Sequence, residues 1–369
     1  MQEQTDNKRF FTRPLAVLLC VCILSFILWG ISVISSPFAD FFNKYIAVFT
    51  RSALSYLTAL LPFSLGETLL LAAPVFVIVL LIYTVIDKDG KNSRRLKTLL
   101  SVLLVLLTLF NFNCSIAYRV TSIGTKLGLS SGGATSDDVI YSFEWICDNV
   151  NALANKVDFN YNSSSKMPYD LKTLNEKLLK TYKENSKKID FLPVLNVSVK
   201  PVALSRVMTY AHISGAYSYY TGEANINIEF PDYTLPYTVA HEMAHQRGII
   251  REDEANFLAF IICISSDDDY IKYSGYVSML EYFMPYAKEA DPDKYTELIR
   301  RLDMRIGGEF RAYSEFYYQH HDSAIGKISD TVNDTFIKSQ GVKSGSKSYN
   351  ESVNIVVSYY KSTLEKREG

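Results

Sequence analysis

Three long runs of apolar residues dominate the first third of the chain. They cover residues 15–34, 68–86 and 98–118, and each holds 19 to 21 residues without a single charge. A helix of about 20 apolar residues is long enough to cross the hydrocarbon core of a bilayer. The pattern therefore predicts a multi-pass α-helical membrane anchor with three spans over residues 1–118.

Basic residues indicate which ends of these spans stay in the cytoplasm. Lys8, Arg9 and Arg13 precede the first span. Five more lie between the second and third spans, namely Lys88, Lys91, Arg94, Arg95 and Lys97. Because cytoplasmic loops are enriched in Lys and Arg, we expect the amino terminus in the cytoplasm and the chain after residue 118 outside the cell membrane. The loop 35–67 between the first two spans is aromatic and too interrupted to span, so it is expected in the interface or packed over the spans.

The rest of the chain has the pattern of a folded domain. Residues 119–135 are rich in Gly, Ser and Thr and read as a linker, with Ser136 as the cap of the first helix. Alternating residues predict strands at 194–199 and 224–229. Helical spacing predicts helices near 137–157, 170–185, 237–247, 252–265, 269–289, 292–304, 307–321 and 348–362. We expect an α+β, mostly helical domain over 136–369 with a small antiparallel or mixed sheet.

Charge and cysteine content exclude two classes of protein. Residues 1–118 hold 10 basic and 6 acidic residues, whereas 119–369 hold 28 and 33. An acidic outer domain is not a nucleic-acid binder. The five cysteines are too few for a disulfide scaffold. Cys147 and Cys263 could pair, but unpaired core cysteines are the favoured interpretation.

The segment HEMAH at 241–245 carries the clearest chemistry. Helical positions i and i+4 lie on one face, so His241 and His245 can direct ring nitrogens at one zinc ion. Glu242 lies about 100° round the helix, where it can reach a water on that metal and act as the general base. Arg247 departs from the pattern because zincin helices usually have an apolar residue there.

A catalytic zinc site needs a third protein ligand. Arg251 stands where metzincins have their third histidine, so that class is not favoured. The segment EDEAN at 252–256 is similar to the E-x-x-A-(D/N) pattern of gluzincins. This register makes Glu252 the third ligand, with Glu254 as the alternative, and Asn256 the residue that orients a ligand.

Two further groups are expected around such a centre. The oxyanion that forms during peptide hydrolysis needs a donor besides the metal. The candidates are Tyr317, His320, His321 and Tyr349. A strand edge beside the metal, from 217–221 or 224–229, is a candidate for pairing with an extended substrate. His212 is expected to be a hydrogen-bonded sheet residue.

The block TGEANINIEFPDYTLPYTVAHEMAHQRGIIREDEANFLA at 221–259, together with the three spans before it, resembles the bacterial membrane family called domain of unknown function 3810. This resemblance covers nearly the whole chain. It implies a zincin-like predicted metallopeptidase group and supports the interpretation of HEMAH and EDEAN as one site.

The leading hypothesis is a membrane-anchored peptidase with one zinc ion (Zn²⁺), which hydrolyses a peptide or protein substrate outside the cytoplasmic membrane. The alternative is a non-catalytic zinc-bearing sensor or binding domain. Glu242 favours the enzyme, because a structural zinc site does not need that carboxylate. Transport is disfavoured, since the three spans contain no Asp, Glu, Lys or Arg.

Overall fold

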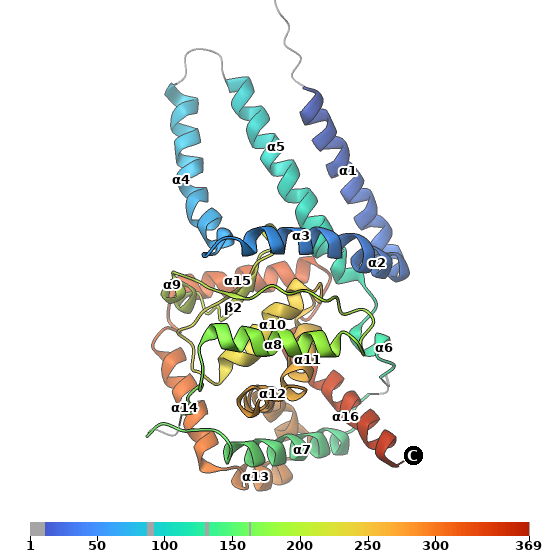
Figure 1. Ribbon diagram of the computed structural model, residues 1–369, viewed down its shortest axis with the longest axis vertical. Helices are drawn as coiled ribbons and strands as arrows, with labels where there is room; N and C mark the ends of the chain where they lie inside the picture. Colours follow the sequence, from blue (N-terminus) through green and yellow to red (C-terminus); the bar gives the residue numbers. More distant parts are fainter. Residues whose placement is uncertain (1–11, 87–91, 130–132, 162–163, 369) are drawn as a thin grey trace, which may run out of the picture.

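The computed structural model describes residues 12–86, 92–129, 133–161 and 164–368. Three long helices stand on one side of a larger, mostly helical part, and two shorter helices lie across the boundary (Figure 1). The expectation of a mostly helical chain with a small mixed sheet is confirmed.

The three long helices are α1 (Arg13–Ile34), α4 (Leu65–Ile86) and α5 (Asn92–Phe110). The third continues through η2 (Asn111–Ser115) and η3 (Ala117–Arg119). Over Arg13–Ile34, Leu65–Tyr83 and Arg95–Arg119 they are long and apolar enough to cross a membrane, and these segments overlap the three predicted spans. α1 packs along α5 through a small cluster that includes Leu15, Cys22 and Leu104.

The loop between the first two long helices is itself helical. It forms α2 (Ser36–Phe42), η1 (Asn43–Ala47) and α3 (Val48–Ala59), and it lies across the ends of the long helices (Figure 1). Ser55 and Thr58 of α3 donate hydrogen bonds to the carbonyl oxygens of Gly222 and Thr221, at 2.6 and 3.2 Å. The α2–α3 layer is therefore bound directly to the larger part of the molecule.

The larger part contains most of the helices and all three described strands. In chain order its elements are α6 (Ile123–Lys126), α7 (Ser136–Ala154), α8 (Leu171–Asn185), β1 (Lys200–Pro201), α9 (Ser205–Tyr210), β2 (Gly215–Tyr217), β3 (Ala224–Ile226), α10 (Thr234–Gln246), α11 (Glu252–Ile264), α12 (Asp269–Ala290), α13 (Pro292–Arg300), α14 (Met304–Tyr318), α15 (Ala324–Ser339), η4 (Gly345–Glu351) and α16 (Ser352–Glu368).

The sheet is small and its order is β1-β3-β2. β1 pairs in parallel with β3, and β2 pairs antiparallel with β3, with Gly215 opposite Ile226. β2 therefore lies at the edge of the described sheet. α10, α11 and α12 pack together beside it and, with α7, form the centre of the hydrophobic core.

Three local predictions need correction. The first concerns the start of α7: its cap is Thr135 and not Ser136, because the Thr135 hydroxyl accepts from the Asp138 N–H while Asp138 accepts from the Thr135 N–H. The second concerns residues 119–135, which were expected to be a plain linker: they include α6, and the Ile123 side chain is buried in the core.

The third correction concerns residues 194–199, which alternate between exposed and buried as expected but form no strand. Side chains take several of the backbone bonds of this segment. At its end, Asn175 of α8 donates to the Val199 carbonyl at 3.0 Å and accepts from the Val199 N–H at 2.8 Å. A correct pattern of burial therefore does not guarantee a strand partner. The helices α9 and α15 were not predicted.

The five cysteines are free, and both Cys147 and Cys263 are buried. Burial raises the pKa of the Cys147 thiol to about 12, which keeps it protonated and unreactive at neutral pH. Both cysteines behave as small apolar core residues.

Candidate metal centre

His241 and His245 lie one turn apart on α10, and both are buried. Every residue of this helix is buried, so the apolar residues around the two histidines hold it in place on all sides. The Tyr182 hydroxyl of α8 also donates to the Ala240 carbonyl at 2.6 Å. The helix that carries the motif is thus fixed by packing and by a buried hydrogen bond.

The orientation of the His245 ring follows from its second nitrogen. Nδ1 lies 2.8 Å from the carbonyl oxygen of Ile249. A carbonyl only accepts, so Nδ1 carries a hydrogen, and Nε2 is the nitrogen that faces Glu252 and the centre. The two imidazole rings meet edge to face with their centroids 4.5 Å apart.

A tight turn brings the next helix back to the histidines. Gly248 has φ +87°, and a Cβ there would collide with Arg51 of α3, so both the backbone and the space require glycine. α11 then begins at Glu252, whose Oε2 lies 3.2 Å from His241 Nε2 and 3.4 Å from His245 Nε2. The structure therefore places Glu252 together with both histidines in one buried cluster.

The spacing of these three atoms suits a small tetrahedral cation. Ligand atoms at about 2.0–2.1 Å from a tetrahedral zinc lie about 3.3 Å from one another. The distances of 3.2 and 3.4 Å from Glu252 Oε2 to the two Nε2 atoms agree with that edge length. Two imidazoles with one carboxylate form a typical ligand set for catalytic zinc. The cluster fits zinc in spacing and chemistry.

The charges within the cluster support each other. Burial alone raises the pKa of Glu252, but the imidazoles of His245 and His241 outweigh it and hold this pKa well below its ordinary value. Burial opposes a charge on His245, yet the facing Glu252 carboxylate raises its pKa to about 9. The cluster is thus built to hold positive charge close to Glu252.

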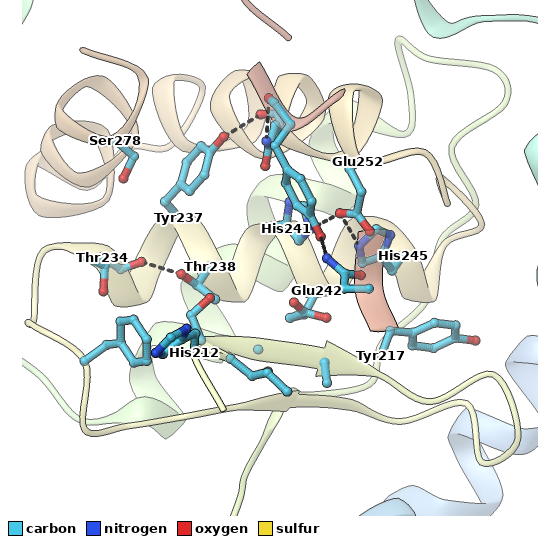
Figure 2. A pocket seen from close by; sticks show the side chains of 18 of the residues that line it. His212, Tyr217, Thr234, Tyr237, Thr238, His241, Glu242, His245, Glu252 and Ser278 are labelled. Atoms are coloured by element: carbon cyan, nitrogen blue, oxygen red, sulfur yellow. Dashed lines mark hydrogen bonds and ion pairs between the residues drawn. The ribbon is translucent and has the colours of Figure 1, made fainter. Parts of the chain in front are cut away.

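Glu242 points from α10 toward the sheet and lines the same cavity as the cluster (Figure 2). Gly215 of the edge strand β2 lies directly against it, since a Cβ on Gly215 would be 2.6 Å from Glu242 Oε1. Oε2 of Glu242 is buried and has no hydrogen-bond partner among the described residues. Burial raises the pKa of Glu242, which makes this carboxyl a stronger base than an exposed one.

Glu254 and Asn256 are not part of the cluster, although Asn256 lines the same cavity. Glu254 accepts from the Ile123 N–H at 3.1 Å and lies 3.5 Å from Arg251, and it is not part of the cluster. Burial raises its pKa to about 7. Asn256 donates to the Tyr349 carbonyl at 3.1 Å, and its described hydrogen bonds include none to the three clustered residues. Its role in orienting a ligand stays a prediction.

Only one of the four suggested oxyanion donors borders the cavity next to the cluster. That residue is Tyr349. Tyr317, His320 and His321 are not among the residues that line the cavity. His320 Nδ1 instead bonds the Phe316 carbonyl at 2.9 Å, and His321 Nδ1 bonds the Tyr318 carbonyl at 3.0 Å.

The cavity has a volume of about 700 Å³ and extends along α10 away from the cluster. In Figure 2 the lining residues Thr234 and Ser278 lie toward one side of the view, and His245 and Tyr217 lie toward the other. It is bordered by β2, α12, α14 and α15, and several lining residues were not predicted, among them Gly215, Glu281, Tyr282 and Tyr313. A glycine at the start of a strand signals close approach of another group, so Gly215 could have been found from the sequence.

His212 also lines this cavity, but it lies in a turn and not in the sheet as expected. It has φ +58°, a backbone conformation that non-glycine residues seldom adopt. Its ring contacts the Asp330 carboxylate at 3.1 Å and the His320 carbonyl at 3.3 Å. These contacts connect the turn to α15 across the cavity.

The fold and the site together define a mostly helical protein with three apolar helices and a buried cluster of two histidines and a glutamate. The chain belongs to the family described as protein of unknown function (DUF3810), whose model matches residues 41–357. No curated protein and no solved structure matches the chain.

Proposed function

We propose that this protein is a membrane-anchored zinc-dependent peptidase that hydrolyses peptide bonds on the outer face of the cytoplasmic membrane. The observation that carries this proposal is the cluster of His241, His245 and Glu252 at one end of a large cavity, with Glu242 beside it. This combination of three ligands and an adjacent free carboxylate is typical of metal-dependent hydrolysis.

The residues of the cluster and Glu242 have separate roles in the proposed reaction. His241, His245 and Glu252 hold the ion, and zinc, when bound, supplies Lewis-acid polarisation of a water molecule and of a carbonyl oxygen. Glu242 accepts the proton of the attacking water and passes it to the leaving amine. Its buried, unpaired Oε2 and its raised pKa suit both transfers.

Substrate binding and oxyanion stabilisation involve two neighbouring groups. The edge strand β2 lies against Glu242, so a peptide paired with this strand would place its backbone beside the metal cluster. Tyr349 is the preferred oxyanion donor, because of the four candidates it alone lines the cavity.

The arrangement of the long helices supports an outer location for the domain. The start of α1, the end of α4 and the start of α5 lie remote from the larger part (Figure 1). The basic residues of the first 118 positions concentrate at and just before the start of α1 and from the end of α4 into the start of α5. The positive-inside rule then places them in the cytoplasm and the metal centre outside.

A non-catalytic zinc-binding sensor is the second candidate, and the bilayer would be its partner as well. The position of Glu242 favours the enzyme. Burying a carboxyl oxygen without a hydrogen-bond partner costs stability, and a role as the general base would explain why the chain keeps Glu242 there.

The test uses the full chain in lipid nanodiscs, with zinc content and cleavage of a broad peptide library measured in parallel. We expect the wild type to hold one zinc and to cleave. Glu242→Gln should retain the zinc and lose activity by about 10²- to 10⁴-fold. The matched control is Glu289→Gln on the exposed surface of α12, which should behave as the wild type. Zinc without cleavage in the wild type would establish the sensor instead.

A further inference from the structure

The cavity has a second acidic end, away from the metal cluster. Glu281 of α12 lines it, and Oε1 of this residue accepts the Tyr233 hydroxyl at 2.6 Å. Tyr233 immediately precedes α10, and the eight residues from there to His241 correspond to about 12 Å along the helix axis. Glu281 is not part of the metal cluster but borders the same cavity.

Glu281 has no cationic partner in the described part of the chain. None of the ion pairs described includes it, and no Lys or Arg is among the residues that line the cavity. The buried Glu309, which also acts to raise the pKa of Glu281, is acidic as well. A carboxylate in such surroundings attracts a cation from outside the protein.

The walls next to Glu281 have a matching character. Phe230, Tyr237, Tyr282 and Tyr313 present aromatic rings to the cavity. Such rings pack well against the methylene groups of Lys or Arg, and their faces attract the charged head. A long side chain that is apolar along its stem and cationic at its tip fits this end better than an acidic or short one.

We propose that this end of the cavity is a binding subsite for a Lys or Arg side chain of the peptide that is cleaved at the metal cluster. The proposal rests on the peptidase function. An extended peptide covers about 12 Å in three to four residues, and the length of the basic side chain contributes part of that reach. The basic residue is therefore expected within three positions of the cleaved bond.

The protonation of Glu281 agrees with this role. Burial raises its pKa to about 7, so in the absence of a cationic ligand the Glu281 carboxylate can become neutral by binding a proton. The groups that face it are Tyr233, Glu309, Tyr313 and Tyr282, none of which is cationic. A bound ammonium or guanidinium group would restore the carboxylate and release the proton.

The test compares peptides that differ at one position, with Lys, Arg or norleucine, in cleavage by the zinc-loaded full chain in nanodiscs. We expect Lys and Arg peptides to be preferred, and Glu281→Gln to lower their kcat/KM by about 10- to 100-fold while norleucine peptides change little. Glu289→Gln, the same substitution on the same helix but exposed, should leave the preference intact.

A second readout separates this proposal from the peptidase function. Binding of the same Lys and norleucine peptides is measured by calorimetry with Glu242→Gln and with Glu242→Gln/Glu281→Gln. If the wild type cleaves none of the peptides, while Lys peptides bind more tightly than norleucine peptides only when Glu281 is present, the subsite stands and the peptidase function fails. If the ratio of Lys to norleucine affinity is the same in both variants, the subsite is wrong.

Discussion

α4 and α11 are both rich in large apolar residues, yet their surroundings are opposite. In α4 most side chains are exposed, with Leu70 at 74% and Val75 at 61%. In α11 every residue from Glu252 to Cys263 is buried against other helices. Hydrophobicity alone therefore does not tell whether a helix faces lipid or protein. The charged residues indicate the surroundings better: α11 carries three carboxylates in its first turn, whereas α4 has only Glu67.

The largest effect is the expected difference in stability between two Phe→Ala substitutions, one in α11 and one in α4. Phe260→Ala in α11 should lower the free energy of unfolding by about 3–5 kcal/mol, because its side chain is fully buried and a cavity would remain. Phe76→Ala in α4 should change it little, because that ring is half exposed on the surface we assign to lipid. Denaturant unfolding in nanodiscs measures both. Equal losses would mean that α4 packs against protein.

The second prediction concerns the carboxylates that distinguish α11. Glu252→Gln should weaken zinc binding on the order of 100-fold or more, because it removes the negative charge of the carboxylate that lies against both histidines. Glu254→Gln should keep zinc affinity nearly unchanged, since that carboxylate bonds the Ile123 N–H instead. Competition with a chelating dye measures both affinities. The reverse order would make Glu254 the ligand.

A third prediction tests the end of α10, just before the turn into α11. Arg247 donates to the carbonyls of Met243 and Leu195 at 3.0 and 2.6 Å and lies 4.0 Å from the centroid of the Tyr182 ring. Arg247→Met should cost about 2 kcal/mol, because the Leu195 carbonyl loses its buried donor. The exposed Arg300→Met is the control. A loss no larger than that of the control would show that these hydrogen bonds contribute nothing.

The smallest effect is a pH dependence of stability that comes from Glu281 of α12. Burial raises the pKa of Glu281 from 4.5 to about 7. The folded chain then holds more protons than the unfolded chain between these values, so this contribution to stability falls as the pH rises from about 5 to 7. We expect about 1–2 kcal/mol. Unfolding of the zinc-free protein at pH 5 and 8 should show it, and Glu281→Gln should remove it; an unchanged slope would contradict the shift.

The sequence predicted the helical framework well where periodicity was strong. The predicted helices 170–185 and 252–265 differ from α8 and α11 by a single residue at one end. It failed where tertiary contacts replaced local rules, as at 194–199, where the Asn175 side chain took the place of a neighbouring strand. α15 was missed because Thr331, Val332 and Thr335 lower its helix propensity. The packing of its Gly326 against His212 and of its Phe336 against Phe110 compensates.

Contacts with residues distant in sequence explain why Arg247 can stand where zincin helices usually have an apolar residue. Burial lowers the pKa of its guanidinium to about 10. The Tyr182 ring and the Leu195 carbonyl, both distant in sequence, make the buried charge tolerable.

By itself the sequence determined the three apolar segments, the helix that carries HEMAH and the pairing of this motif with EDEAN. These follow from local spacing, because helix geometry fixes which neighbours share a face. Only the tertiary structure decided that Glu252 and not Glu254 meets the histidines, that Tyr349 alone of the four suggested donors borders the cavity, and that Glu281 forms its second end. The angle between two helices and the approach of distant segments depend on the packing of the whole core, which no local pattern encodes.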